Sequence, residues 1–328
     1  MFLIKSNLNK FQKRYNKQIK IINIFSFLSI ILALNSIYDT NLDIKVCVCT
    51  IGKKENRYAR EFVEHYKRYD VDKIFIYDNN NESDEKFETV LSDYINSGFV
   101  KIINYRGKQK IQMTAFNHCY RENKFFFNWF IFYDMDEFIH LKNFNNIKKY
   151  LTKSDFDKCN IIYLNHVLHT DNNQIYYYNK SLFERFPKIE NFMNANYSYY
   201  PRRVLKDITK IIIRGNLSKV QMGNPHFLDN NPGNCCNGYG IIINQSSIHL
   251  NPPDHKNYYF DHFYFKSSEE YLHKLDVGDV FFGGKRGYHL YWFQIYFAFN
   301  EITKEKLDYF ENKTNINLKY FRQKISQI

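Results

Sequence analysis

From residue 45 onward, apolar runs of strand length alternate with amphipathic stretches of helix length, and this alternation restricts the possible folds more than any other feature. The expected elements are, in order, strand 45–51, helix 56–69, strand 73–77, helix 85–95, strand 99–105, helix 111–123 and strand 129–133. Such an order predicts an α/β fold with a mainly parallel, twisted sheet that carries helices on both faces. In sheets of this kind, ligands bind outside the carboxyl ends of the strands.

The second half of the chain has a weaker pattern. Beyond about residue 160 it contains short aromatic strands and loops rich in Asn, Gly and Pro, notably residues 223–240. Helices are expected again over residues 269–275 and 291–304. Since there is no internal repeat and no linker long enough to separate two independent units, we expect one domain over residues 44–328.

An apolar stretch over residues 19–38, free of charge after Lys20, precedes this domain. As a helix it would span about 30 Å, which is enough to cross the core of a bilayer. Six basic residues precede the first acidic one, Asp39, which predicts that the tail, residues 1–18, stays in the cytosol in a single-pass type II topology. A cleaved signal peptide is the alternative, because Ala33 and Ser36 are small, but the basic region is long for one.

Charge and cysteine content bear on the partners and the compartment of the chain. Residues 1–38 supply six of the 46 basic residues, and the others are intermixed with 34 acidic residues, so the net charge of +12 does not indicate nucleic-acid binding. Six cysteines fit a lumenal or external domain that tolerates disulfides. Cys47 and Cys49 alternate on an expected strand and are interpreted as small core residues, while Cys235 and Cys236 lack the spacing of a zinc site.

Asp134 and Asp136 directly follow the buried strand expected over residues 129–133. If the strand continues, both side chains point the same way. Two carboxylates that emerge together repel each other unless a cation lies between them, and Mg²⁺ or Mn²⁺ suits both carboxylate and diphosphate oxygens. The alternative interpretation is a solvated turn with capping carboxylates. The spacing therefore favours a metal and diphosphate site at this edge of the sheet.

Several segments, in this order, resemble glycosyltransferase family 92 and its bacterial relatives, which adopt the GT-A fold, a Rossmann-like α/β fold. The matching segments are residues 49–55, 61–66, 76–79, 112–119 and 129–138, followed by residues 182–186, 224–227 and 261–274. The sequence departs from the family pattern at three positions: Lys54 stands where Asn is commoner, Asp261 replaces Asn, and Phe263 replaces Tyr. The resemblance implies a nucleotide-binding half over about 44–140 and an acceptor-binding half over about 141–328.

The resemblance also implies roles for residues of the first half. Thr50 and Glu55 would hold the base and ribose of the donor, and Asp78 would bind uracil or ribose. Gln112, in the 112–119 segment, would join this group, while Asp134 and Asp136 would reach the diphosphate through the metal. Simpler roles are open for three of these residues: Thr50 and Asp78 could cap helices, and Glu55 could be a first-turn acid of the next helix.

In the second half, His226 is the expected third metal ligand and His262 an expected diphosphate contact, although isolated histidines are often structural. Lys266 would stabilise the charge of the departing diphosphate, a role for which Lys274 and Arg286 are weaker candidates. Glu184 is the candidate catalytic base, with an ion pair to Arg185 as the alternative role. An inverting mechanism is implied by the resemblance.

These patterns together predict a metal-dependent glycosyltransferase that moves a hexose, galactose-like, from a UDP-sugar to a hydroxyl of a glycan or glycoconjugate. In a eukaryotic cell the predicted anchor would place it in the Golgi or endoplasmic reticulum membrane. A non-catalytic, membrane-tethered carbohydrate-binding protein is one alternative. A metal-dependent nucleotidyltransferase is less favoured, because residues 50–56 contain a single glycine where such enzymes carry a glycine-rich phosphate loop.

Overall fold

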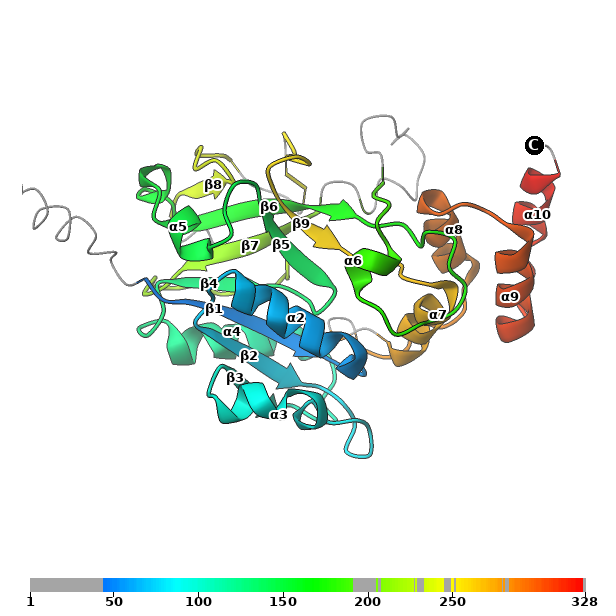
Figure 1. The fold of residues 1–328 in the computed structure, drawn as a ribbon, viewed down its shortest axis with the longest axis horizontal. Coiled ribbons are helices and arrows are strands. Elements are labelled where there is room, and N and C mark those ends of the chain that lie inside the picture. Colours follow the sequence, from blue (N-terminus) through cyan, green and yellow to red (C-terminus); the bar gives the residue numbers. More distant parts are fainter. Residues whose placement is uncertain are drawn as a thin grey trace, which may run out of the picture. The chain divides into compact units, whose positions relative to one another are not determined.

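Four parallel strands form the first half of the sheet in a computed structural model of the chain (Figure 1). They are β1 (Val46–Gly52), β2 (Lys73–Asp78), β3 (Val100–Asn104) and β4 (Trp129–Phe132), in the spatial order β3-β2-β1-β4. All seven residues of β1 are buried, as expected for a central strand covered on both faces. The α/β alternation predicted from the sequence is confirmed for this half, and the strand bounds differ by no more than one residue.

The second half of the sheet is mixed: of the eight pairings between the described strands five are parallel, as predicted for most of the sheet, and three, all involving second-half strands, are antiparallel. Its strands are β5 (Glu137–Leu141), β6 (Ile161–Leu168), β7 (Thr209–Arg214), β8 (Cys235–Asn237) and β9 (Tyr258–His262), and the order continues as β4-β7-β6-β9-β5. β7 runs antiparallel to both β4 and β6, and β5 runs antiparallel to β9. β6 pairs in parallel with β8 and β9. Antiparallel neighbours need no crossover helix, so this half does not show the strand–helix alternation on which the prediction rested.

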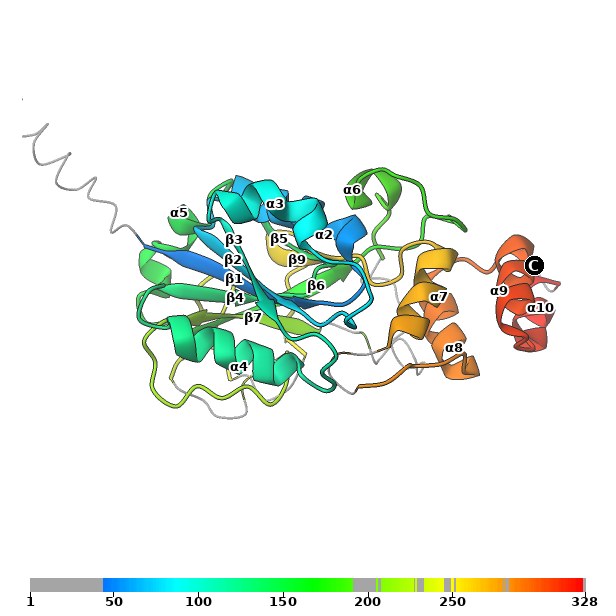
Figure 2. The ribbon, with the colours of Figure 1, turned by 90° about the horizontal axis from the view of Figure 1, so that it is seen from below.

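Helices cover both faces of the sheet, as predicted. Figure 2 shows α2 (Asn56–Arg68) and α3 (Glu88–Asn96) on one face and α4 (Gln112–Asn123) on the other. One face of α2 is buried, because its apolar residues recur every three or four positions: Tyr58, Ala59, Phe62, Val63 and Tyr66. The sheet is thus the middle layer of three, with its core on both sides.

α2 also reaches the far end of the sheet. The Tyr66 hydroxyl donates to the carbonyl of Glu137 at 3.0 Å, and His65 Nε2 lies 3.0 Å from the carbonyl oxygen of Ile139. Both carbonyls belong to β5, the last strand of the order, yet α2 precedes β2 and is joined to β1. The sheet therefore curls back on itself, which brings β5 beside the carboxyl end of β4.

The variant His65→Gln is expected to flatten the pH dependence of stability between about pH 6.5 and pH 4. Burial lowers the pKa of His65 from its usual 6.5 to about 4. In this window the unfolded chain binds a proton that the folded domain does not, so stability falls by about 3 kcal/mol as the pH falls. Urea unfolding of the full chain at several pH values would measure the slope. An unchanged slope in the variant would mean that the acid sensitivity arises elsewhere.

The remaining helices follow the sheet strands. They are α5 (Ile147–Leu151), the 3₁₀ turn Ser154–Phe156, α6 (Leu182–Arg185), α7 (Ser268–Val277), α8 (Leu290–Phe299), α9 (Lys304–Thr314) and α10 (Lys319–Ile325). The helix expected over residues 291–304 ends early, because Asn300 adopts an extended backbone conformation. α7 to α10 pack around a second aromatic core that includes Tyr271, Tyr296 and Phe310. Figures 1 and 2 place these helices beyond the carboxyl ends of β1 and β2.

The structure describes residues 44–190, 205, 208–226, 228, 233–244, 249–250, 252–278, 280 and 283–326. The basic tail and the apolar stretch 19–38 lie outside these residues, so the membrane anchor stays a prediction. Within the described ranges, no helix is both long enough and apolar enough to span a bilayer.

Two disulfides cross-link the domain. Cys49 on β1 is bonded to Cys119 on α4, and Cys159 is bonded to Cys236 on β8. Cys47 is a buried free thiol and Cys49 is fully buried in the same core cluster, which agrees with the interpretation of both as core residues, and Cys49 is disulfide-bonded in addition.

Candidate active site

The turn after β4 carries the two expected metal-binding carboxylates. β4 ends at Phe132, and Asp134 and Asp136 lie in the turn that leads to β5. The alternation of a continuing strand therefore does not apply, and the two side chains meet different partners. Asp134 accepts hydrogen bonds from Gln112 Nε2 at 2.8 Å and from Lys210 Nζ at 2.6 Å.

Asp136 is buried and faces two ammonium groups. Its Oδ2 atom lies 3.0 Å from Lys266 Nζ and 2.9 Å from Lys274 Nζ, and its Oδ1 atom lies 3.6 Å from His262 Nε2. Burial alone would raise the pKa of Asp136, but Lys266, Lys274 and His262 bring it well below its usual value. Asp136 therefore remains a carboxylate, and Lys266 lies in the site as predicted.

Lys210 and Glu137 are buried next to Asp134, and neither was predicted as a functional residue. Lys210 on β7 is fully buried, and its Nζ atom lies 3.0 Å from Glu137 Oε2. Burial raises the pKa of Glu137, Lys210 lowers it, and Asp134 and Asp136 raise it, so that the pKa lies at about 8. In the sequence, Lys210 stands out only as a lysine beside a run of isoleucines. Glu137 stands out only because it follows Asp136.

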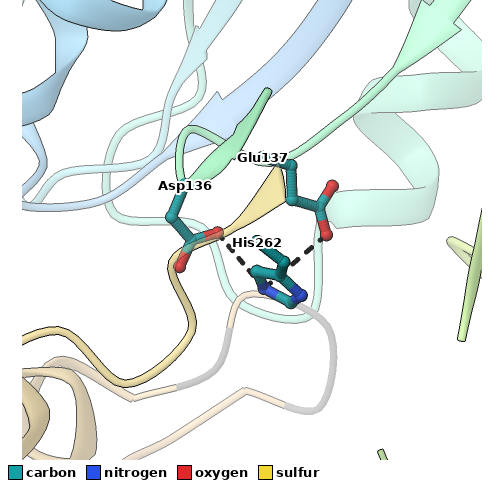
Figure 3. Close-up of side chains that lie close together, drawn as sticks. All are labelled: Asp136, Glu137 and His262. Atoms are coloured by element: carbon teal, nitrogen blue, oxygen red, sulfur yellow. Dashed lines mark ion pairs between the residues drawn. The ribbon is translucent and has the colours of Figure 1, made fainter. Parts of the chain in front are cut away.

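Figure 3 shows Asp136 and Glu137 pointing from the turn toward the ring of His262. Glu137 and His262 face each other across the β5–β9 pair. One ligand atom from each of the three residues lies within 4.8 Å of the others, and all three residues are buried. The three side chains make a donor set of two carboxylates and one imidazole, which suits a divalent metal ion.

The ring of His262 is oriented by a second histidine. His166 Nε2 lies 2.6 Å from the carbonyl oxygen of Leu205, so this nitrogen carries the proton that it donates. With a neutral His166, its Nδ1 atom accepts a hydrogen bond from His262 Nδ1, 3.1 Å away. The Nε2 lone pair of His262 then faces the carboxylates of Asp136 and Glu137, at 3.6 and 3.8 Å. The repulsion between these lone pairs is relieved by the proton that Glu137, with its raised pKa, keeps near neutral pH, or by a cation that takes the place of this proton.

His226, the expected third metal ligand, lies outside this group of three. Its Nδ1 atom lies 2.9 Å from the carbonyl oxygen of Thr209, and burial, together with Lys210, lowers its pKa to about 3. Of the three predicted ligands Asp134, Asp136 and His226, the structure places Asp136 alone in the group, with Glu137 and His262 beside it.

Glu55, at the end of the loop after β1, borders the same charges. Burial raises the pKa of Glu55, as do Asp136 and Asp134, and Lys266 and Lys274 lower it, so that the pKa lies at about 8. Glu55 occupies the N-cap position of α2, but its side chain makes no capping hydrogen bond. The carboxyl group therefore faces the site, and helix capping does not explain it.

The residues of the site fall within one family match. Residues 43–283 match the family model for glycosyltransferase family 92. The chain belongs to glycosyltransferase family 92.

Individual relatives match a smaller part of the chain. A glycosyltransferase family 92 protein of Ricinus communis is 31% identical over 104 residues, which is 32% of this chain and 18% of that protein. One of Oryza sativa subsp. japonica is 35% identical over 96 residues, 29% of this chain and 16% of that protein. The matched part thus spans less than a fifth of the length of these relatives.

Among solved structures, S. aureus TarS 1–349 in complex with UDP is 14% identical, with a TM-score of 0.33, over 54% of this chain and 48% of that one. The same protein in complex with UDP-GlcNAc is 16% identical, with a TM-score of 0.30, over 54% of this chain and 47% of that one. At these TM-scores the likeness carries no argument about fold or activity.

Two residues that the family resemblance assigns to the nucleotide have other surroundings in this family 92 chain. Thr50 is fully buried within β1, and its hydroxyl has no hydrogen-bond partner among the described residues. Asp78 accepts from Arg106 at 2.5 Å and from the backbone and side chain of Asn80 at 3.0 and 2.8 Å. Neither residue caps a helix, because the N-cap positions of α2 and α3 are Glu55 and Phe87.

Arg106 was not predicted as a functional residue. It also donates to the carbonyl oxygens of Asn81, Asp84 and Glu85. The Asp78–Arg106 pair therefore orders the loop after β2, and a ligand of Asp78 would have to share its carboxylate with this pair.

Glu184 is not part of the group of Asp136, Glu137 and His262. It forms a capping box with Ser181 at the start of α6, in which Ser181 N donates to its carboxylate at 3.3 Å. The neighbouring Arg185 is buried and pairs with Glu270 on α7 through both ends of its guanidinium group. Two of the family segments, residues 182–186 and 261–274, are joined by this ion pair.

Proposed function

We propose that this family 92 domain is a metal-dependent glycosyltransferase that moves a hexose from a UDP-sugar to a glycan hydroxyl with inversion. The observation that carries the proposal is the buried group of Asp136, Glu137 and His262 at the carboxyl end of β4, with two lysines on Asp136. This is the edge where open α/β sheets bind ligands.

The residues present fit a divalent metal ion. The unprotonated Nε2 atom of His262 faces the carboxylate of Asp136 and the carboxyl group of Glu137, whose raised pKa of about 8 is the response expected of a buried acid beside other acids when no metal ion is bound. Two carboxylate oxygens and one imidazole suit Mn²⁺, and Mg²⁺ is the second choice because it prefers oxygen ligands. When bound there, the ion would neutralise charge on the diphosphate of the donor.

A basic cavity beside the group supports a diphosphate donor. It has a volume of about 480 Å³, and its charged and ionisable lining residues are Lys53, Lys54, Lys108, Lys110, Lys285, His273 and Asp276. The cavity borders the site at two points along the chain. His273 precedes Lys274, which binds Asp136, and Lys54 precedes Glu55. Such an excess of lysines favours an anionic ligand.

Lys266 and Lys274 are proposed to stabilise the leaving group. Both ammonium groups are held on Asp136. Lys274 belongs to α7, which also supplies lining residues of the cavity. In the transfer, the acceptor oxygen bonds to the anomeric carbon as the bond from that carbon to the diphosphate oxygen breaks. The two lysines are placed to donate to the oxygen that gains charge.

The proton of the acceptor hydroxyl needs a carboxylate base. Glu184 remains the base that the family resemblance implies, and to act it must leave its capping box with Ser181. Glu55 is the second candidate, because it borders Asp136 and its pKa of about 8 suits proton transfer near neutral pH.

We also propose that the domain lies on the non-cytosolic side of a membrane, tethered by residues 19–38. The two disulfides support an oxidising compartment, since such bonds are rare in the cytosol. The basic residues of the tail support the type II orientation.

A panel of UDP- and GDP-sugars, assayed for binding and hydrolysis with Mn²⁺, Mg²⁺ or chelator, tests the transferase proposal. We expect a UDP-hexose to bind and turn over with Mn²⁺, and activity to be lost in chelator, because the carboxylates and His262 then repel one another and the diphosphate. The variant Asp93→Asn, which removes an exposed partner of Arg60, is the control and should behave as wild type. Absence of binding by every sugar nucleotide in every metal condition would rule the proposal out.

A further inference from the structure

Two adjacent phenylalanines project from the loop after α4. Phe125 and Phe126 are 72% and 69% exposed, the highest values among large apolar side chains in the described part of the chain. The loop itself is well anchored. Phe126 N donates to the carbonyl of Asn123 at 2.8 Å, and the next residue, Phe127, packs against Phe75 and Phe130. The two rings are therefore held outward by an ordered turn, which is unusual for a soluble surface.

The loop lies where the N-terminal segment joins the domain. Lys45 N donates to Asn128 Oδ1 at 2.7 Å, and Asn128 N donates to the carbonyl of Lys45 at 2.7 Å. Figure 2 shows the carboxyl end of α4 and the start of β1 at the same end of the sheet, opposite α7 to α10. Residues 39–44 separate this point from the apolar stretch 19–38, and six residues reach no more than about 20 Å.

The charges around the rings suit a membrane surface. Lys124 directly precedes Phe125, and its Nζ atom lies 5.1 Å from the centre of that ring. Lys45 is also exposed, and its backbone N–H donates to Asn128, which anchors the loop. Aromatic rings with lysines at their rim are the combination that binds at the interface of a bilayer with anionic lipids.

We propose that Phe125 and Phe126 insert into the interface of the bilayer that residues 19–38 cross, so that the domain docks on the membrane through this loop. The proposal rests on the predicted anchor, which was part of the proposed function, and not on the transfer reaction. A tether alone would leave the domain free to rotate. The loop adds a second contact, which fixes its orientation.

The docked orientation has a consequence for the acceptor. The active site lies at the carboxyl end of β4, whereas the loop lies at the amino end of the same strand, and the seven residues of the neighbouring β1 span about 23 Å. The site then opens away from the bilayer. This geometry favours an acceptor sugar on an extended glycan over one attached directly to a lipid headgroup.

The proposal can be tested by fluorescence quenching of the full chain in vesicles of phosphatidylcholine and phosphatidylserine. An environment-sensitive fluorophore is attached at Phe126→Cys, and at Tyr176→Cys as the matched control, since Tyr176 is 64% exposed and packs beside Tyr309 on α9. The two native cysteines outside the disulfides, Cys47 and Cys235, are buried. With quencher groups on the lipid chains we expect about a twofold loss of emission at position 126 and no loss at position 176.

Three outcomes would overturn the proposal. Vesicle-bound protein without quenching at position 126 would leave the anchor in place but exclude the docked loop. Equal quenching at both positions would mean that the domain lies on the membrane without a fixed orientation. Protein that fails to float with the vesicles would refute the anchor and the docking together. None of these readouts depends on sugar transfer, so failure of the transferase proposal would be seen separately in the donor panel.

Discussion

Replacing Asp136 with asparagine should lower the rate of hexose transfer at least about a hundredfold, the usual effect of removing a buried charge that stabilises a transition state. Asp136 belongs to the proposed metal-binding group and also holds the ammonium groups of Lys266 and Lys274. The amide keeps the shape of the side chain but removes the charge. The comparison is made as kcat with a saturating UDP-hexose and Mn²⁺.

Binding of Mn²⁺ to Asp136→Asn, followed by paramagnetic resonance, would separate two explanations for a lost rate. Weaker binding is expected, because one of two carboxylate ligands is missing. The surface variant Asp93→Asn serves again as the control for expression and folding. Rates within a few-fold of wild type in Asp136→Asn, or in excess chelator, would exclude the metal role of this carboxylate.

The largest expected effect on stability comes from Arg185→Met. The pair of Arg185 and Glu270 is buried, and Glu270 also accepts hydrogen bonds from Tyr58 at 2.6 Å and from Ser267 Oγ at 2.5 Å. Removing the guanidinium group leaves a buried carboxylate without its cation, so we expect the free energy of unfolding to fall by about 3–5 kcal/mol. Denaturant unfolding of the full chain would measure it.

Two further variants distinguish the roles of the segment that holds Arg185. The double variant Arg185→Met/Glu270→Gln should recover part of the loss, since the uncompensated charge is gone. Glu184→Gln, on the same helix turn, changes an exposed capping contact and should cost no more than about 1 kcal/mol. If Glu184→Gln abolishes transfer while stability is kept, Glu184 is the base. A smaller loss in Arg185→Met than in Glu184→Gln would contradict the structural role of the ion pair.

The first half of the fold was predictable because its signal is local. β1 and β4 are uninterrupted buried runs, β2 is nearly so, and α2 has one apolar face, so the bounds of these elements follow from the apolar pattern. The order of the second half was not predictable, because β7 inserts between β4 and β6 through pairings of residues far apart in the sequence. The Asn300 break that ends α8 was missed for a related reason: Asn300 is held by Asp171, whose backbone N–H donates to it at 2.7 Å.

The site divides in the same way. Asp136, Lys266 and Gln112 could be named as candidates because each lies in a segment with a recognisable pattern, and their roles stay predictions. Glu137 could not be assigned, since its role depends on the β5–β9 pairing that sets it opposite His262. Lys210 reaches the site from a strand expected to be purely apolar, and its charge is stable there only because Asp134 and Glu137 lie within hydrogen-bond distance. Contacts of this kind are tertiary and leave no mark in residue spacing.

The two disulfides have a consequence for the order in which the chain folds during synthesis. Cys49–Cys119 closes a loop of 70 residues that ends before Cys159 is made, and Cys159–Cys236 closes a separate loop of 77 residues. Because the loops follow one another without overlapping, the first can be oxidised while the second is still on the ribosome. Each loop of this length removes about 4 kcal/mol of chain entropy from the unfolded state in the loop-closure treatment. In the oxidising compartment that we propose for the domain, the first disulfide could therefore form before the antiparallel strands that complete the sheet have been synthesised.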